Sequence, residues 1–515
     1  MSSNSLTNDA NGAGDYDPTG EDKDQCDFLK ASLTILVIGA SGDLAKKMTF
    51  PSLFSLYKYG YLPESTQICG YARSQKEDDE FRDGLRENLD GEDKEKDEFL
   101  KMVIYRNGES YDDRDSLKKI FEELKKNENE KCANRLFYFA VPPGVFVDAA
   151  GALKEVAQTE SGWNRYIIEK PFGKDLESFE EMNSKMSKTI DETDLFRIDH
   201  YLGKEMMQTL MVLRFSNSTF EPLWNRNHIN CVVISLKENF GTAGRGGYFD
   251  QYGIIRDVMQ NHMLQALTMV AMEPPVKVSG NYIRDEKVKV LQAMPEIKLE
   301  DCVLGQFYAD KEGKIPSYTD DEGVPEDSTT ATFATMVMFI NNARWEGVPF
   351  IMRAGKALNE KKAEVRIQFK SPGGMRTLFP DAAVPNNELV LKFQPEEAIY
   401  MKTNIKTPGL VGDPLETELD LSYRTRFKDK AKKLPEAYTR LILNVLLGDK
   451  SMFVRGDELR EAWRVFTPLL HKIDEEKVKP IKYQALTRGP KESDELIQKY
   501  GFQYSGVYKW SKPKM

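Results

Sequence analysis

An aspartate and a histidine lie within the apolar stretch GIIRDVMQNHMLQAL. His262 titrates near neutral pH, so it is suited to act as a general base. On a regular helix, Asp257 and His262 are five residues apart and do not share a face, so the carboxylate that orients His262 is expected to come from elsewhere. Asp199 is a candidate. The alternative is a core histidine whose hydrogen bonds are satisfied within the fold.

Two further segments carry groups that bind anions, RIDHYLGKEM and YIIEKPFGKD. If a helix begins in the first segment, His200 and Lys204 share one face at i and i+4, and with Tyr201 they supply donors for phosphate oxygens. Lys170 ends a predicted strand, where doubly wound folds bind ligands. Two alternatives stay open. Lys204 could lie on the outer face of an ordinary helix, and Lys170 could be a turn residue before Pro171.

The segment TILVIGASGDLAKKMTFPSLFSLY is typical of a buried strand, a glycine turn and a helix. The two glycines of the turn allow the backbone to approach a pyrophosphate, which the helix N-terminus then favours. A tight turn without a ligand is the alternative. Arg73, near the end of the second predicted strand, suits a 2′-phosphate and favours NADP over NAD. The coenzyme-binding residues are expected to be Gly39, Ala40, Ser41, Gly42, Asp43, Leu44, Arg73 and Lys170.

The elements that position these residues follow two patterns. Strands and helices alternate over about residues 28–200, which predicts an α/β, Rossmann-like, doubly wound dinucleotide-binding domain. Residues 201–515 contain a run of strands, and AEVRIQFK alternates with period two. They predict a larger α+β domain with a big, mostly antiparallel sheet. Residues 1–27, acidic and rich in Ser, Asn, Gly and Asp, are expected to form a disordered tail.

Composition excludes several classes of protein. The net charge of -10 argues against a nucleic-acid partner. The chain has five cysteines, an odd number, and no C-x-x-C motif, so we expect free thiols and no zinc site. No apolar run is long enough to span a bilayer, and the N-terminal residues carry no secretory h-region. We therefore expect a cytoplasmic protein with no membrane partner.

Five motifs occur together in this order: GASGDLAKK, EKPFG, RIDHYLGKE, QNHMLQ and RAGKALNEKKAE. With them the chain resembles the NADP-dependent glucose-6-phosphate dehydrogenases, of the animal type, from about residue 30 to the C-terminal FQYSGVYKW. The resemblance implies oxidation of β-D-glucose 6-phosphate at C1 to 6-phosphoglucono-1,5-lactone with reduction of NADP to NADPH, the first step of the oxidative pentose phosphate pathway. A general base must take the C1 hydroxyl proton, because loss of hydride alone would leave a strongly acidic oxocarbenium ion.

The same resemblance implies a role for each motif residue. His262 is the base and Asp199 orients it. His200, Tyr201 and Lys204 hold the phosphate, and Lys170 contacts both substrate and coenzyme. The remaining substrate contacts are Glu238, Asp257, Lys356 and Lys361.

Animal members of the family also carry a second, structural NADP. The matching positions are Arg353, Lys362, Arg366, Lys392, Lys402, Asp420, Arg488, Tyr504 and Trp510. Two positions depart from the family pattern: Lys392 replaces an arginine and loses bidentate binding, and Phe146 replaces a tyrosine near the coenzyme.

The alternative function is a non-catalytic NADP-binding sensor or scaffold of the same fold. It is disfavoured because His262, Asp199 and Lys204 are all retained. A dehydrogenase for another sugar phosphate, or for an unphosphorylated hexose, is a closer rival. The family also implies a homodimer or homotetramer.

Overall fold

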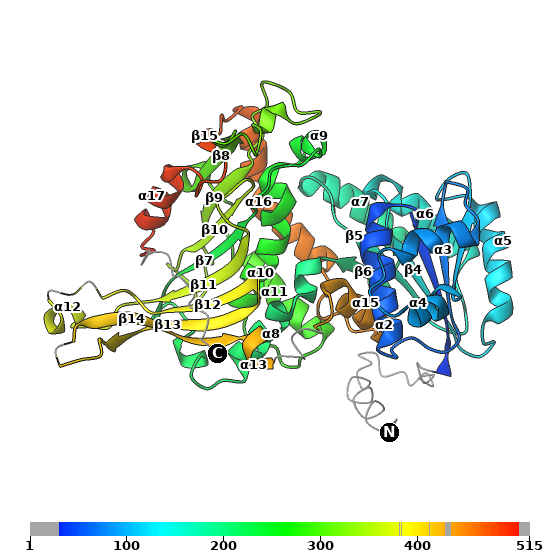
Figure 1. Ribbon diagram of the computed structural model, residues 1–515, viewed down its shortest axis with the longest axis horizontal. Coiled ribbons are helices and arrows are strands. Elements are labelled where there is room, and N and C mark those ends of the chain that lie inside the picture. Colours follow the sequence, from blue (N-terminus) through cyan, green and yellow to red (C-terminus); the bar gives the residue numbers. More distant parts are fainter. Residues whose placement is uncertain (1–29, 381, 383, 411, 428–433, 504–515) are drawn as a thin grey trace. The chain divides into compact units, whose positions relative to one another are not determined.

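Six strands of the N-terminal region form one parallel sheet (Figure 1). The computed structural model describes residues 30–503 except 381, 383, 411 and 428–433. The strands are β1 (Ser32–Ile38), β2 (Thr66–Ala72), β3 (Val103–Asn107), β4 (Ala133–Phe139), β5 (Asn164–Glu169) and β6 (Leu195–Ile198). Their order is β3-β2-β1-β4-β5-β6, and every neighbouring pair is parallel. The order reverses between β1 and β4, so ligands are expected at the carboxyl ends of these strands. The predicted doubly wound fold is confirmed.

Helices connect these strands, and their N-termini follow local sequence signals. They are α2 (Phe50–Lys58), α3 (Asp78–Arg86), α4 (Asp93–Leu100), α5 (Arg114–Leu124), α6 (Phe146–Val156) and α7 (Leu176–Thr189). Asp113 caps α5 by accepting from the Ser116 amide at 3.1 Å. Asp175 and Ser178 form a capping box at the start of α7.

The described chain divides into two compact units. The first takes in the described residues of Met1–Gly203 with Pro275–Asp285 and Pro435–Arg460, and the second takes in those of Lys204–Pro274, Glu286–Leu434 and Glu461–Met515. Sequence analysis placed the domain boundary at residue 200 and so assigned Pro275–Asp285 and Pro435–Arg460 to the second domain. In the structure both segments belong to the first unit. One of them carries α15 (Ala437–Leu447), whose buried residues include Leu441, Ile442 and Val445. This helix packs on α2, so its apolar face completes the first unit.

A nine-stranded sheet forms the centre of the second unit (Figure 1). Its strands are β7 (Ile229–Lys237), β8 (Cys302–Tyr308), β9 (Phe333–Met338), β10 (Phe350–Gly355), β11 (Lys362–Phe369), β12 (Glu388–Gln394), β13 (Ala398–Lys406), β14 (Pro414–Ser422) and β15 (Ile481–Gln484). They are ordered β14-β13-β12-β11-β7-β10-β9-β8-β15, with parallel pairing only at β7–β10 and β8–β15 among the described strands. The predicted, mostly antiparallel sheet is confirmed.

The helical stretch that carries Asp257 and His262 is not a regular helix. It consists of α9 (Gly246–Asp250), a π-helix over Ile255–Met263 and α10 (Leu264–Ala271). The π-helix packs on β7 and β10. Hydrogen bonds from i to i+5 widen each turn, so residues five apart lie about one turn apart. The expectation that Asp257 and His262 point to different faces assumed an α-helix, and that assumption is wrong.

The remaining α-helices of the described chain are α8 (Glu205–Phe215), α11 (Gly280–Gln292), α12 (Met375–Leu378), α13 (Tyr423–Phe427), α16 (Gly456–Glu475) and α17 (Lys491–Lys499). No helix among the described residues is long and apolar enough to cross a membrane.

Cysteine pairing differs in part from the expectation of free thiols. Cys69, Cys231 and Cys302 are free. Cys132 is disulfide-bonded. The absence of a C-x-x-C pair therefore did not exclude a disulfide bond.

Candidate functional site

The turn after β1 requires glycine, because it passes close to the backbone that follows β4. Gly39 has φ +80°, and a Cβ there would lie 2.4 Å from the carbonyl oxygen of Ala140. Its amide and that of Ala40 donate to the Tyr71 carbonyl at 2.8 and 3.2 Å, which fixes the turn against β2. Only glycine fits Gly39, and the exposed Gly42 keeps the surface open before the helix starts.

Arg73 follows directly after β2 and is exposed, as a coenzyme-binding arginine must be. Its guanidinium lies 5.3 Å from the ring centroid of Tyr111. Arg73 follows the carboxyl end of β2, which pairs in parallel with β1, so its backbone lies at the same sheet edge as the turn after β1. Sequence analysis did not single out Tyr111, which is separated from Arg73 by a helix-containing connection.

Lys170 lies where it was expected, directly after β5. The residue before it, Glu169, is a buried acid that sequence analysis missed. Its Oε1 accepts from the Tyr138 hydroxyl at 2.7 Å, and its Oε2 accepts from the Tyr438 hydroxyl at 3.4 Å. Burial raises the pKa of Glu169 to about 7, against the opposing effects of Tyr138, Lys170 and Tyr438.

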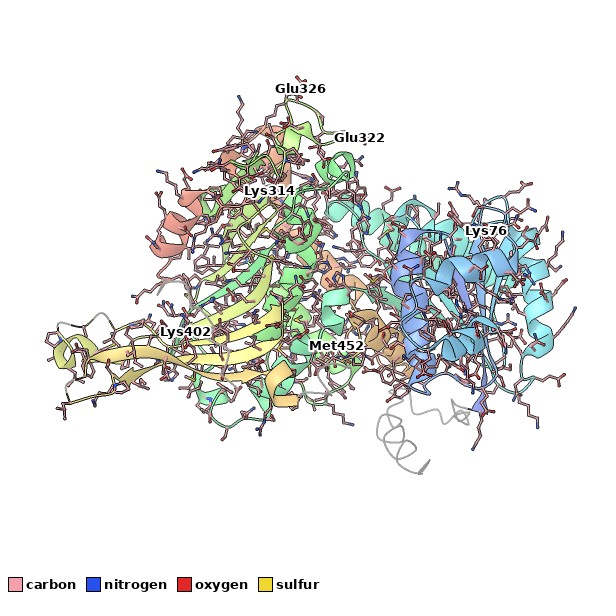
Figure 2. All side chains as sticks on the ribbon, in the orientation of Figure 1. Lys76, Lys314, Glu322, Glu326, Lys402 and Met452 are labelled. Atoms are coloured by element: carbon pink, nitrogen blue, oxygen red, sulfur yellow. The ribbon has the colours of Figure 1, made fainter. Side chains whose placement is uncertain are left out.

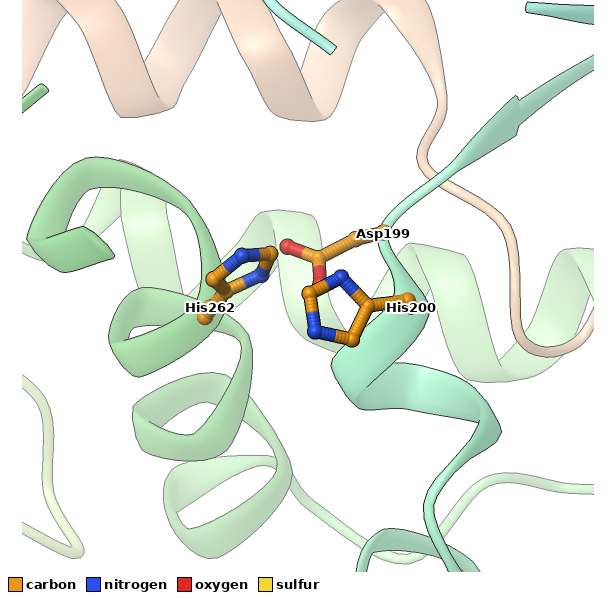
Figure 3. Close-up of side chains that lie close together, drawn as sticks. All are labelled: Asp199, His200 and His262. Atoms are coloured by element: carbon orange, nitrogen blue, oxygen red, sulfur yellow. The ribbon is translucent and has the colours of Figure 1, made fainter. Parts of the chain in front are cut away.

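Asp199 and His200 follow directly after β6 (Figure 3). Asp199 is only 3% exposed, and its Oδ1 accepts from the Tyr201 amide at 3.0 Å. His200–Gly203 forms a single 3-10 turn, in which Tyr201 is buried and His200 is half-buried. The end of β6 thus presents a carboxylate, an imidazole and a phenol together.

Lys204 does not continue the helical turn that contains His200. It is the N-cap of α8, with extended backbone angles of φ -72° and ψ 142°. The expectation that His200 and Lys204 share one helix face is therefore wrong, because the extended residue interrupts the helix. The Lys204 Nζ donates to Gln394 Oε1 at 2.9 Å. Gln394 ends β12, 190 residues away, and no local signal in the sequence marked it.

His262 lies in the π-helix of the second unit and is 3% exposed (Figure 3). Its amide donates to the Asn261 side chain at 2.8 Å. A π-helix is rare and is frequently found at functional sites. Its presence at the one histidine that sequence analysis favoured as a base is consistent with that choice.

Three predicted substrate contacts come together where the carboxyl ends of the parallel strands β7 and β10 meet the π-helix, which carries Asp257. Lys356 Nζ lies 2.7 Å from Glu238 Oε2 and 3.2 Å from Asp257 Oδ2. Burial lowers the pKa of Lys356, but the charges of Asp257 and Glu238 outweigh burial, and the net shift is upward. Two carboxylates held by one ammonium are suited to accept hydrogen bonds from sugar hydroxyls. Lys361 is exposed, just before β11.

The residues predicted to hold a second nucleotide lie on neighbouring strands of the large sheet. Strand register places Arg353, Lys362, Arg366, Lys392, Lys402 and Asp420 on one face, and Lys402 is labelled in Figure 2. Carboxylates alternate with these cations, as in the contact of Arg366 Nη1 with Glu388 Oε2 at 2.7 Å. Arg488 lies between β15 and α17, within 3.4 Å of Asp494. Tyr504 and Trp510 lie outside the described residues.

The two departures from the family pattern occupy different environments. Phe146 is fully buried and packs edge-on against Phe139, with ring centroids 6.0 Å apart. Lys392 is half-buried on β12, opposite Glu364 of β11.

Two family models match the chain, and together they cover most of it. Residues 36–209 match the NAD binding domain of glucose-6-phosphate dehydrogenase, and residues 211–510 match its C-terminal domain. The boundary between the matches, at residue 210, lies within α8.

Individual relatives agree with these matches over nearly the full length. The chain is 52% identical over 486 residues to glucose-6-phosphate 1-dehydrogenase of Dictyostelium discoideum, covering 93% of this chain and 97% of the relative. It is 50% identical over 495 residues to the cytoplasmic isoform of Solanum tuberosum, covering 94% of each. A solved structure of a glucose-6-phosphate dehydrogenase in complex with its substrate glucose 6-phosphate matches with a TM-score of 0.87 and 47% identity, covering 93% of this chain and 99% of that chain.

Proposed function

Because this chain belongs to the glucose-6-phosphate dehydrogenase family, we infer that it oxidises glucose 6-phosphate at C1 to 6-phosphoglucono-1,5-lactone and reduces NADP. This is the first step of the oxidative pentose phosphate pathway. The observation that carries the inference is the 52% identity to a glucose-6-phosphate 1-dehydrogenase over 93% of the chain. The motifs that contain His262 and Asp199 lie within the matched ranges.

The turn after β1 fits the pyrophosphate of a dinucleotide. Gly39 lets this turn pass close to the backbone of Ala140, and the helical turn that follows has amides at its N-terminus, which favour an anion. We propose Arg73 as the residue that binds the 2′-phosphate and thereby selects NADP over NAD, since it is exposed directly after β2. When bound, NADP accepts the hydride that leaves C1.

The chain's own contribution to chemistry is to move one proton and to hold the substrate. We propose that His262 takes the proton of the C1 hydroxyl as the hydride departs, so that the product is a neutral lactone. We also propose that Asp199 accepts from the His262 imidazole and stabilises it once protonated. Burial supports these roles: both side chains are 3% exposed and each needs a polar partner.

Specificity for a phosphorylated sugar is assigned to two groups of residues. We propose that His200, Tyr201 and Lys204 donate to the phosphate, with Lys170 between substrate and coenzyme. Glu238 and Asp257 accept from the sugar hydroxyls, and Lys356, held between them, fixes their positions. Lys361, exposed just before β11, is a further contact.

Coenzyme reduction, followed spectrophotometrically, tests the inferred activity. Four reactions are compared, with NADP or NAD and with glucose 6-phosphate or glucose. We expect the highest kcat/KM with NADP and glucose 6-phosphate. No turnover with this pair would refute the activity and favour the alternative, a non-catalytic NADP-binding sensor or scaffold. Equal kcat/KM for glucose would refute the phosphate-binding role.

We further propose a second, structural NADP on the cationic face of the large sheet. Arg353, Lys362, Arg366 and Lys402 all lie on this face with carboxylates between them. The positive groups are suited to phosphate oxygens. Quantification of NADP retained after gel filtration, in wild type and in Arg366→Ala, tests the site. Equal retention by both proteins would contradict it.

A homodimer or homotetramer is proposed as the assembly. The outer strands β13 and β14 expose Ile405, Leu415 and Leu419, which suits contact with a second copy. Sedimentation equilibrium tests this proposal, and a monomer at micromolar concentration would refute it.

We propose a cytoplasmic location, supported by the cytoplasmic isoform of Solanum tuberosum among the relatives. Fluorescence microscopy of the tagged chain tests the location.

A further inference from the structure

Helix α15 packs closely on the 3-10 turn His200–Gly203, although about 230 residues separate them in sequence. Arg440 Nη1 donates to the Gly203 carbonyl at 3.0 Å. A Cβ on Gly203 would lie 2.4 Å from the carbonyl oxygen of Ala437, so the two backbones are in contact. Both segments belong to the first unit. The position of the turn is therefore set by this helix as well as by β6.

Tyr438, on the first turn of α15, extends this packing to the side chain of His200. The two rings are stacked, with centroids 6.0 Å apart and an interplanar angle of 12°. Tyr201 lies edge-on to the same imidazole, with centroids 5.1 Å apart. Offset stacks and edge contacts of this kind restrict the rotation of a ring. The imidazole of His200 is thus held by one aromatic ring on each of two sides.

The hydroxyl of Tyr438 is in turn held by Glu169. The carboxylate accepts from Tyr438 and from Tyr138, at 3.4 and 2.7 Å. Glu169 is 7% exposed and directly precedes Lys170. The charged side chains that act on it are Lys170 and Asp199, and both belong to the proposed site. A hydrogen-bonded chain thus connects the end of β5 to the ring that packs on His200.

We propose that Tyr438 and Glu169 are positioning residues for phosphate binding: Glu169 fixes the hydroxyl of Tyr438, and the ring of Tyr438 fixes the imidazole of His200. This role rests on the proposed function, in which His200 donates to the phosphate. Neither Tyr438 nor Glu169 needs to touch the substrate. Their effect is to reduce the number of orientations that His200 must give up when the phosphate arrives.

Variants of Tyr438 separate the ring from the hydroxyl. Tyr438→Leu removes both, and we expect the KM for glucose 6-phosphate to rise about tenfold, with the KM for NADP changed less than about twofold. Tyr438→Phe keeps the stacked ring, and we expect a rise of only about threefold. Glu169→Gln is expected to match Tyr438→Phe, and the double variant should add nothing further, because both changes break one connection.

Unphosphorylated glucose provides the readout that a general structural defect would not spare. It offers no phosphate to His200, so kcat/KM for glucose is expected to stay within about twofold in Tyr438→Leu. Tyr166→Leu is the control for a general packing defect, because Tyr166 is fully buried on β5 and its hydroxyl accepts from the Gln158 side chain at 3.1 Å. We expect Tyr166→Leu to leave the ratio of the two kcat/KM values unchanged.

The outcomes distinguish this proposal from the one on which it rests. Absence of wild-type turnover with glucose 6-phosphate would refute the proposed function. Wild-type turnover combined with an unchanged KM in Tyr438→Leu would overturn the positioning role alone. Equal losses with glucose and glucose 6-phosphate in Tyr438→Leu would also overturn it, since they would indicate a change in the whole fold.

Discussion

Replacing Glu169 by glutamine should make the stability of the protein less dependent on pH. Glu169 is buried between Tyr138 and Tyr438, and burial raises its pKa from 4.5 to about 7. The folded protein therefore holds a proton on this carboxyl between pH 4.5 and 7, whereas the unfolded chain releases it. Glutamine has the same size and can still accept from Tyr138, but it does not titrate.

The sign and magnitude follow from proton linkage. Because the folded state binds more protons in this window, the free energy of unfolding falls as pH rises from 4.5 to 7 and is constant above it. A shift of about 2.5 pH units, at about 1.4 kcal/mol per unit, corresponds to about 3 kcal/mol. The wild type should lose this amount relative to Glu169→Gln across the window.

Urea unfolding of both proteins at pH 5, 6, 7 and 8 measures this difference. We expect the free energy of unfolding of Glu169→Gln, relative to wild type, to rise by about 2–3 kcal/mol between pH 5 and pH 8. Glu122→Gln, at an exposed position of α5, is the control and should give a constant difference. A constant difference for Glu169→Gln as well would refute the reasoning, and a decrease would reverse its sign.

Four further variants test the site. His262→Asn should lower kcat about 10²–10⁴-fold while glucose 6-phosphate still binds; a near-normal kcat in steady-state assays would refute the base assignment. Arg73→Ala should raise the KM for NADP at least about tenfold but leave that for NAD within about twofold, and parallel changes in both constants would argue against a 2′-phosphate contact. Gly39→Ala should destabilise the protein by about 1–3 kcal/mol, because a Cβ would lie 2.4 Å from a backbone oxygen at φ +80°; an unchanged melting temperature would contradict this. Lys356→Met should lower the free energy of unfolding by about 3 kcal/mol, because it leaves Glu238 and Asp257 without the ammonium that pairs with them. If calorimetry shows no loss of stability, water replaces the ammonium and the prediction is wrong.

The turn at Gly39 and the position of Lys170 were predictable because they depend on neighbours in sequence. A buried strand followed by glycines and a helix defines the first, and the end of an apolar run defines the second. The same holds for the run of strands that forms the large sheet. Short strands such as β8 and β15 were not recognised, because four to seven residues without clear alternation carry little periodic signal.

Other features depend on contacts that no local pattern records. The π-helix around His262 differs from an α-helix by one residue per hydrogen-bonded ring, and its apolar pattern resembles that of an ordinary buried helix. The contact of Gln394 with Lys204 joins residues 190 positions apart, and that of Tyr438 with Glu169 joins residues 269 positions apart. Only the folded chain brings these groups together.

The packing of α15 on α2 and on the turn at Gly203 also affects how the protein is made. A ribosome adds about 5–20 residues per second, so residue 447 follows residue 203 by about 12–50 s. During that interval the six-stranded sheet has been synthesised, but the apolar surface of α2 that α15 later covers stays exposed to solvent. The first unit is therefore N-terminal in sequence yet among the last parts to be completed. Nascent chains stalled before residue 437 are the ones expected to require a chaperone.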